Sequence, residues 1–349
     1  MTVSNDDLKA AVQRGILSEA QVGQLLALAA TRRTAKDGVA ASEEPFVLFK
    51  GFNEVFVVVG LVILFTGWVG VATLLGLDTD APAGVTTMVL SAVTIALLAM
   101  VGRYFTTTRR MVAPSIALSV MTASSAAVLG VALIGGSFGL YSVPAVALFV
   151  ALVMGAHYLV FRIPFSAAII AGMTYYALFS AWTMGQAESA IPWGSGGGIG
   201  LTLLTIVFGL AVFALAMRLD LSDPERVSTR SATAFWLHVV AAPAIVNSVA
   251  LRLLADGGVQ AQAVLVGFLV IIAVIAVVID RRSFLISGAG YSVALAATVF
   301  DGGAAVAILI LGLALVVLGA GWERLRARLM AALPDFPGKS RLPAHEAAP

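Results

Sequence analysis

The sequence predicts an all-α membrane protein, a polytopic bundle of about ten transmembrane helices preceded by a short helical hairpin. The chain of 349 residues is 60% hydrophobic and only 11% charged, and its mean hydropathy is +1.00. Apolar runs of at least about 17 residues, which suit a bilayer, recur along the chain as far as residue 321. Because these runs fill most of the sequence, we exclude a soluble core and a cleaved signal peptide ahead of a soluble domain.

Each apolar run is close to the length that a helix needs to cross the hydrocarbon core. The predicted spans are 55–75, 85–101, 114–134, 143–161, 165–184, 199–217, 232–254, 261–279, 284–300 and 304–321. Asn53 and Glu54 are expected to stabilise the start of the first span, where a carboxylate suits the helix dipole.

The arginines outside the spans predict the orientation. If the N-terminus is cytoplasmic, every second connection is cytoplasmic and the positive-inside rule is obeyed. Those connections hold Arg103, Arg109, Arg110, Arg162, Arg218, Arg226, Arg230, Arg281 and Arg282, whereas the outer connections hold Arg252. Arginine outnumbers lysine and alanine is abundant, which favours a bacterial source. We therefore expect a multi-pass protein of the bacterial inner membrane with both termini cytoplasmic.

The stretch VVIDRRSFLISG, residues 277–288, places three charged residues between two apolar runs. Asp280, Arg281 and Arg282 form either a buried ionic site or a turn outside the membrane. We favour a tight cytoplasmic turn, because loop arginines ordinarily report orientation. Ser283 is then available as the N-cap of the next helix.

The polar segments predict the remaining organisation. Ser18 and Gln21 form a capping-box pattern after Gly15, a helix stop, so two short helices are expected. The predicted parts are a cytoplasmic hairpin at 1–34, a connector at 35–52, the transmembrane bundle at 53–322, a cationic interfacial helix at 323–333 and a disordered tail at 334–349.

Several classes of function find no support in the sequence. Cysteine is absent, which removes disulfides, thiolate metal sites and cysteine nucleophiles. No catalytic motif, paired carboxylates or metal cluster occurs, so we expect no enzyme activity, cofactor or metal. The net charge is only +2, and nucleic acid is not an expected partner.

Polar groups within the spans are the candidates for a hydrated pathway. Pro243 lies near the middle of its span and frees a backbone carbonyl, and Asn247 follows one turn later on the same face. Tyr175, Tyr176 and Tyr291 lie at a similar depth in other spans. These residues either line a solute pathway or serve close packing between helices.

Two histidines are candidates for proton sensing. His238 lies about two turns into its span and His157 about one turn from the end of its span, so both are expected in the cytoplasmic half. The alternative is that each bonds to a neighbouring carbonyl or to interfacial water.

Three segments stand in a fixed order along the chain. They are RGILSEAQVGQLLAL in the hairpin, DRRSFLISGAGY among the apolar helices and GLALVVLGAGWERLRARL at the last of them. This layout resembles a family of bacterial polytopic membrane proteins known as a domain of unknown function. Ten helices with both termini inside are also similar in topology to the drug and metabolite transporter superfamily. The resemblance implies a membrane bundle and assigns no catalytic or binding residues.

Two functional hypotheses follow. The first is a non-enzymatic membrane scaffold or regulator, motivated by the lack of charge at the midplane. Its hairpin would dock a protein partner, and its basic C-terminal helix a partner or anionic lipid. The alternative is a secondary transporter of a small neutral or lipophilic solute, with a hydrated cavity at Tyr175, Asn247 and Tyr291.

Overall fold

The computed structural model describes most of the chain. It covers residues 52–77, 83–184, 198–224, 226, 228–285, 316–336 and 338–342, with short pieces at 11, 14–18, 21–22, 288–289, 291–293, 309 and 312–313. Within these residues every regular element is a helix, which confirms the predicted all-α class. The chain divides into two units, Met1–Pro45 and Phe46–Pro349.

In the described part of the chain, eight helices are long and apolar enough to cross a membrane. They are α3 (Phe52–Leu77), α4 (Ala83–Gly102) continued by the π-helix η1 (Arg103–Thr108), α5 (Val112–Ile134), α6 (Ser142–Phe161), α7 (Pro164–Thr183), α8 (Gly198–Asp220), α9 (Thr229–Asp256) and α10 (Val259–Ile279). The chain is therefore an integral membrane protein. These helices match the first eight predicted spans, and the last two predicted spans, 284–300 and 304–321, are described only in part.

The remaining helices are short. A 3-10 turn, η2 (Gly139–Tyr141), precedes α6, and the C-terminal region contains α13 (Trp322–Ala332) and the 3-10 turn η3 (Lys339–Arg341). Residues 338–342 thus adopt a defined turn in which Leu342 is buried, where the sequence predicted a disordered tail.

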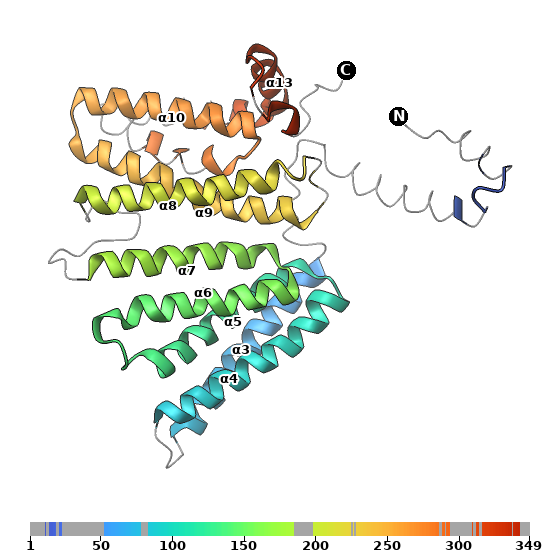
Figure 1. The fold of residues 1–349 in the computed structure, drawn as a ribbon, viewed down its shortest axis with the longest axis vertical. Helices are drawn as coiled ribbons and strands as arrows, with labels where there is room; N and C mark the ends of the chain where they lie inside the picture. The colour runs from blue at the N-terminus through green and yellow to red at the C-terminus, as the bar shows by residue number, and fades with distance from the viewer. Residues whose placement is uncertain are drawn as a thin grey trace. The chain divides into compact units, whose positions relative to one another are not determined.

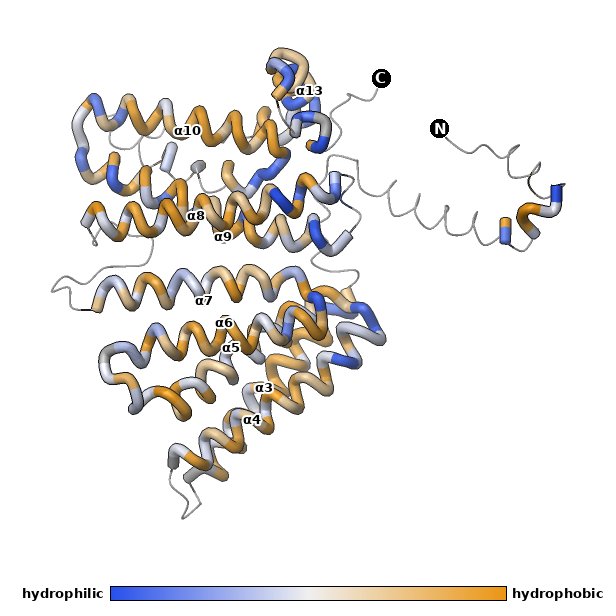
Figure 2. Tube along the Cα trace, in the orientation of Figure 1, coloured by the Kyte–Doolittle hydropathy of each residue, from blue (hydrophilic) through white to orange (hydrophobic). Residues whose placement is uncertain are grey.

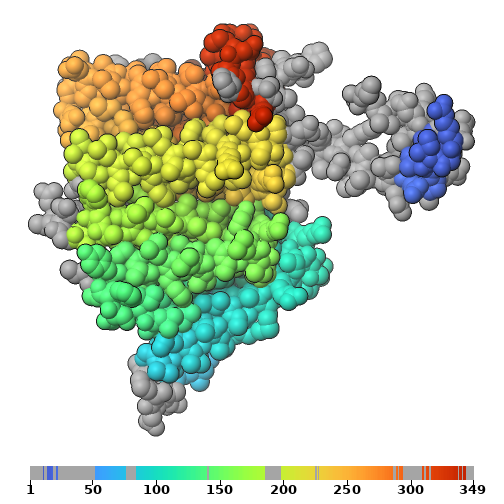
Figure 3. Space-filling model, in the orientation of Figure 1, coloured from blue at the N-terminus to red at the C-terminus, as the bar shows by residue number. Residues whose placement is uncertain are grey.

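The spans pack side by side as successive hairpins (Figure 1). The space-filling view shows the same succession as adjacent bands from α4 to α10 (Figure 3). Helix α9 contacts α7, α8 and α10, and it buries a larger share of its residues than any other described span. A Cβ at Gly209 of α8 would lie only 2.8 Å from Ile245 Cγ1 of α9. Glycine at this position therefore permits the close approach of α8 and α9.

Polar residues collect at the ends of the spans, and the helices between are apolar (Figure 2). Many large apolar side chains on α3, α4, α6 and α10 are exposed, as expected of surfaces that face lipid tails. Helices α4, α6, α8 and α10 all finish at one end of the bundle, which we name the basic end. It carries Arg103, Arg162, Arg218, Arg226 and Arg281, and α9 carries Arg252 and Asp256 at the opposite end.

The first unit confirms one detail of the predicted hairpin. The Ser18 backbone N–H donates to Gln21 Oε1 at 2.9 Å, and the Gln21 N–H donates to Ser18 Oγ at 3.2 Å. Gly15 has a positive φ of 69°. The capping box and the helix stop are both present, and most of residues 1–34 lie outside the described residues.

Glu54 lies in the first turn of α3, as predicted, and has a further role that the sequence did not indicate. Its carboxylate is buried and accepts hydrogen bonds from the backbone N–H groups of Val112, at 3.4 Å, and Ala113, at 3.0 Å. These two donors belong to the first turn of α5, which has no side-chain cap of its own. Glu54 therefore caps a neighbouring helix and joins α3 to α5.

We expect Glu54→Ala to reduce the free energy of unfolding by about 1–2 kcal/mol, because two buried N–H donors lose their acceptor. Unfolding in mixed micelles with increasing dodecyl sulfate measures this loss. Asn53→Ala is the matched control, since Asn53 is exposed on the same turn. Equal effects of the two substitutions would contradict the capping role.

Candidate functional site

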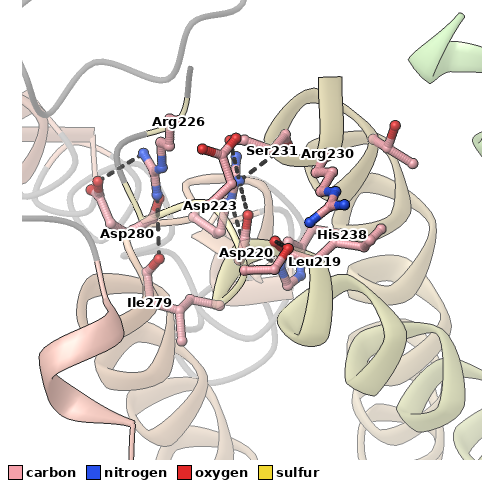
Figure 4. Close-up of polar contacts among 12 residues, drawn as sticks. Leu219, Asp220, Asp223, Arg226, Arg230, Ser231, His238, Ile279 and Asp280 are labelled. Atoms are coloured by element: carbon pink, nitrogen blue, oxygen red, sulfur yellow. Dashed lines mark hydrogen bonds and ion pairs between the residues drawn. The ribbon is translucent and has the colours of Figure 1, made fainter. Parts of the chain in front are cut away.

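Charged side chains from three helix ends meet inside the basic end of the bundle (Figure 4). Helix α8 ends at Asp220, and α10 ends at Ile279 and is followed by its C-cap Asp280, which has a left-handed φ of 57°. Between them, Asp223 accepts hydrogen bonds from the backbone N–H and the hydroxyl of Ser228, at 2.9 and 2.7 Å. Ser228 in turn caps α9 by accepting from the Arg230 N–H at 3.2 Å. These local bonds fix the turn between α8 and α9.

The inner cluster comprises Asp220, Ser231, His238 and Arg281. The Asp220 carboxylate accepts from Arg281 Nε at 3.0 Å and also from Arg281 Nη2, so the pair is bidentate. It also contacts His238 Nε2 at 3.0 Å, and Arg281 Nη2 donates to the Ser231 carbonyl at 3.3 Å. His238 and Arg281 are both 0% exposed. The hydrogen bonds between these groups offset part of the cost of burying the ion pair.

The imidazole of His238 uses only one of its two ring nitrogens in the contact with Asp220. An ionised carboxylate only accepts, so Nε2 carries the hydrogen toward Asp220 and Nδ1 carries the lone pair. The Nδ1 atom is buried without a hydrogen-bond partner. The rings of Phe213 and Phe284 lie 5.5 and 5.9 Å from the imidazole and surround it with apolar surface.

The outer cluster comprises Arg226, Asp280, Arg282, Trp322 and Arg326. Asp280 accepts from Arg226 Nη1 at 2.9 Å and from the Trp322 indole N–H at 2.7 Å. Arg226 Nη2 also donates to the Asp280 carbonyl at 2.9 Å, and the Arg282 guanidinium lies 5.4 Å from the Trp322 ring centroid. These contacts hold the first turn of α13 on the end of α10.

Arg326 lies one turn further along α13 and is also buried. Burial lowers the pKa of its guanidinium below the ordinary value, and the negative charge of Asp280 opposes that shift. Asp280 therefore attracts two points on α13, through the Trp322 hydrogen bond and the charge of Arg326.

The two clusters are joined by a single peptide bond. Arg281 belongs to the inner cluster and Asp280 to the outer one. The turn that carries them is fixed by the Arg281 N–H, which donates to the Ala276 carbonyl at 2.9 Å. Asp280 and Arg281 thus contribute to the two clusters from consecutive positions on one turn.

The predicted turn at residues 280–282 is confirmed. The prediction that a turn and a buried ionic site are alternatives was wrong, because the same residues form both. Asp280 ends α10 in the left-handed conformation and the chain turns there, while Asp280 and Arg281 are 1% and 0% exposed. The turn is buried because α8, α9 and α13 cover it. Ser283 does not cap the next helix, since its hydroxyl is buried without a hydrogen-bond partner.

The predicted pathway residues face different surroundings. Tyr175 is fully buried, its hydroxyl 2.9 Å from Thr205 Oγ1, among Phe179, Leu201 and other apolar side chains. Tyr176, the next residue, is 42% exposed. The structure therefore separates the two tyrosines.

The other pathway candidates lie on and beside α9. Pro243 and Asn247 are partly buried, and α9 continues through Pro243 without ending. Tyr291 is partly buried and packs against the apolar clusters around Ile245 and Leu265. The region near Tyr291 is described only in part.

The two predicted histidines have separate partners. His157 Nδ1 lies 3.2 Å from Ser166 Oγ, and its ring lies 4.8 Å from that of Phe161. His238 is part of the inner cluster. The structure thus gives an ionisable partner to His238 and a hydroxyl to His157.

Asp220, Arg226, Trp322 and Arg326 were not predicted as site residues. One feature of the sequence points to Asp220, because a carboxylate directly ends an apolar run on the side where arginines collect. Its partners His238 and Arg281 come from two other segments, and no sequence spacing brings them together. Within the described residues, no group of three or more His, Cys, Asp and Glu side chains is placed to hold a metal ion.

Comparisons with protein-family models, with curated proteins and with solved structures found no match to this chain.

We expect Asp220→Ala to reduce the free energy of unfolding by about 3–5 kcal/mol, because Arg281 remains buried without its carboxylate. Unfolding in mixed micelles measures the change. Asp256→Ala is the control, since Asp256 is exposed at the other end of α9, and its effect should stay within about 0.5 kcal/mol. A loss at Asp220 no larger than the control would show that the pair contributes nothing to stability.

Proposed function

We propose that this protein is a non-enzymatic scaffold or regulator of the membrane, in which α13 is the part that partners or lipids contact. The observation that carries this proposal is the attachment of α13 to the bundle by Asp280. A helix fixed by a buried hydrogen bond and a buried guanidinium presents its outer face in a constant orientation.

The two faces of α13 differ in chemistry. Trp322, Arg326 and Met330 follow a four-residue spacing and are buried. Arg324 and Arg328 are exposed on the remaining surface. A basic helix beside the ends of transmembrane helices suits anionic headgroups or an acidic protein surface.

The location belongs to the same proposal. We place the basic end, with both termini, on the cytoplasmic side of a bacterial inner membrane. The support is the collection of arginines at that end. The N-terminal hairpin is then a second docking element on the same side, available to a protein partner.

One observation favours the alternative, a secondary transporter. Asp220 and His238 are ionisable groups inside or at the end of spans, and such groups often mark ion or solute pathways. The dry packing of Tyr175 favours the scaffold instead, because that side chain contacts aromatic and aliphatic groups.

Single cysteines in this cysteine-free chain test the orientation. A water-soluble maleimide should label Arg162→Cys only in inside-out vesicles and Asp256→Cys only in right-side-out vesicles, because these exposed residues lie at opposite ends. Labelling of both from the same side would overturn the arrangement.

The same reagent separates the two functions. Asn247→Cys should remain unlabelled in a scaffold, since no aqueous path need reach the middle of α9. Labelling of Asn247→Cys that an added solute prevents would instead establish the transporter.

Photo-crosslinking in native membranes tests the role of α13. A photoreactive side chain at position 328 should crosslink to a partner protein or to lipid headgroups, whereas the same group at buried position 330 should crosslink within the chain. The scaffold role fails if deletion of residues 1–40 and the combined Arg324→Glu and Arg328→Glu change leave every crosslinked partner and every phenotype unaltered.

A further inference from the structure

We propose that His238 Nδ1 is a proton-binding site, and that proton uptake there releases α13 from Asp280. This deepens the proposed function, because it rests on the role of α13 and adds the condition under which α13 is held. The ligand is a single proton taken from solvent onto the free lone pair, and the Nε2 hydrogen stays with Asp220.

The carboxylates around His238 are already occupied by other groups. Asp220 holds Arg281, Asp280 holds Arg226 and Trp322, and Asp223 accepts from Ser228. Each of Asp220, Asp223 and Asp280 is less than 9% exposed.

The nearby positive charges are Arg226, Arg281 and Arg326, which are buried or nearly so, and Arg282, which is partly exposed over Trp322. Among the described residues, three buried carboxylates thus face three buried guanidiniums, while Glu323 on α13 is exposed, and neutral His238 preserves the balance of the buried groups. A protonated His238 adds a cation to these groups, which Asp220 favours and which both Arg281 and Arg226 oppose.

The geometry leads from His238 to α13. A protonated imidazole competes with Arg281 for the Asp220 carboxylate, because both groups donate to that one acceptor. Phe284, whose ring packs beside His238, follows Arg281 on the same turn. Displacement of Arg281 or Phe284 moves Asp280, and the Trp322 indole then loses its acceptor.

The direction of the pH dependence follows from this balance. Proton uptake on Nδ1 adds a positive charge to the site, so docking of α13 is favoured at neutral pH and weakens as the pH falls. For an unperturbed imidazole in the released form, one proton shifts the docking equilibrium toward release by up to about 30-fold between pH 7.5 and 5.0.

Thiol reactivity in the full-length protein in nanodiscs measures docking. Met330 is 0% exposed on the docked face of α13, and Ala331 is exposed on the same helix. We expect the labelling rate of Met330→Cys, divided by that of Ala331→Cys at the same pH, to rise between pH 7.5 and 5.0, by up to about 30-fold. The division removes the effect of pH on the thiol reagent itself.

Two further variants identify the group that titrates. His238→Gln keeps an Nε2 donor for Asp220 but takes no proton, so the ratio should stay low at both pH values. Asp280→Asn weakens the attachment of α13 directly, and the ratio should be high at both. A rise with acid that persists in His238→Gln would overturn the site, as would a ratio in the original chain that does not change with pH.

Nitrogen-15 spectra of the histidine ring provide a measurement that does not need the His238→Gln variant to fold. In a His157→Asn, His345→Asn background only His238 contributes, and Nδ1 must gain a proton over the same pH range. An Nδ1 that stays unprotonated at pH 5.0 while α13 is released would overturn the site. The crosslinks from position 328 report the scaffold role separately, so failure of the proton site leaves that role standing.

Discussion

The bidentate contact between Asp220 and Arg281 is the interaction on which the basic end depends. It ties the last residue of α8 to the second residue after α10, and α9 lies between them with Ser231 and His238 in contact. Buried ions of opposite charge are costly to separate, because either partner alone would remain without compensation. The main effect of the pair is therefore to fix how three helix ends meet, and its net contribution to the free energy of unfolding is secondary.

The same constraint explains the position of α13. Asp280 is placed by its neighbour Arg281, and its carboxylate then orients Trp322 and attracts Arg326. The C-terminal helix is thus attached to the bundle through charge and hydrogen bonding, whereas the spans associate through small residues such as Gly209 and through apolar packing. A polar attachment responds to charge in a way that an apolar contact does not.

Elsewhere in the described bundle, polar side chains are satisfied between neighbouring helices. Glu54 caps α5, Tyr175 and Thr205 join α7 to α8, and Trp68 donates to Thr94 across α3 and α4. In lipid such groups have no water to bond, so pairing them within the protein is the favourable arrangement.

The sequence by itself determined the class of the fold, eight of the spans within a few residues, the capping box at Ser18 and the turn at Asp280. Each depends on neighbouring residues, because helix length, apolar composition and turn chemistry are local properties. Only the tertiary structure decided that Asp220, His238 and Arg281 meet, that Glu54 serves α5 and that Tyr175 and Tyr176 face different surroundings. Those contacts join segments far apart in the chain. The sequence alone does not distinguish a charged residue that faces water from one that meets a buried partner.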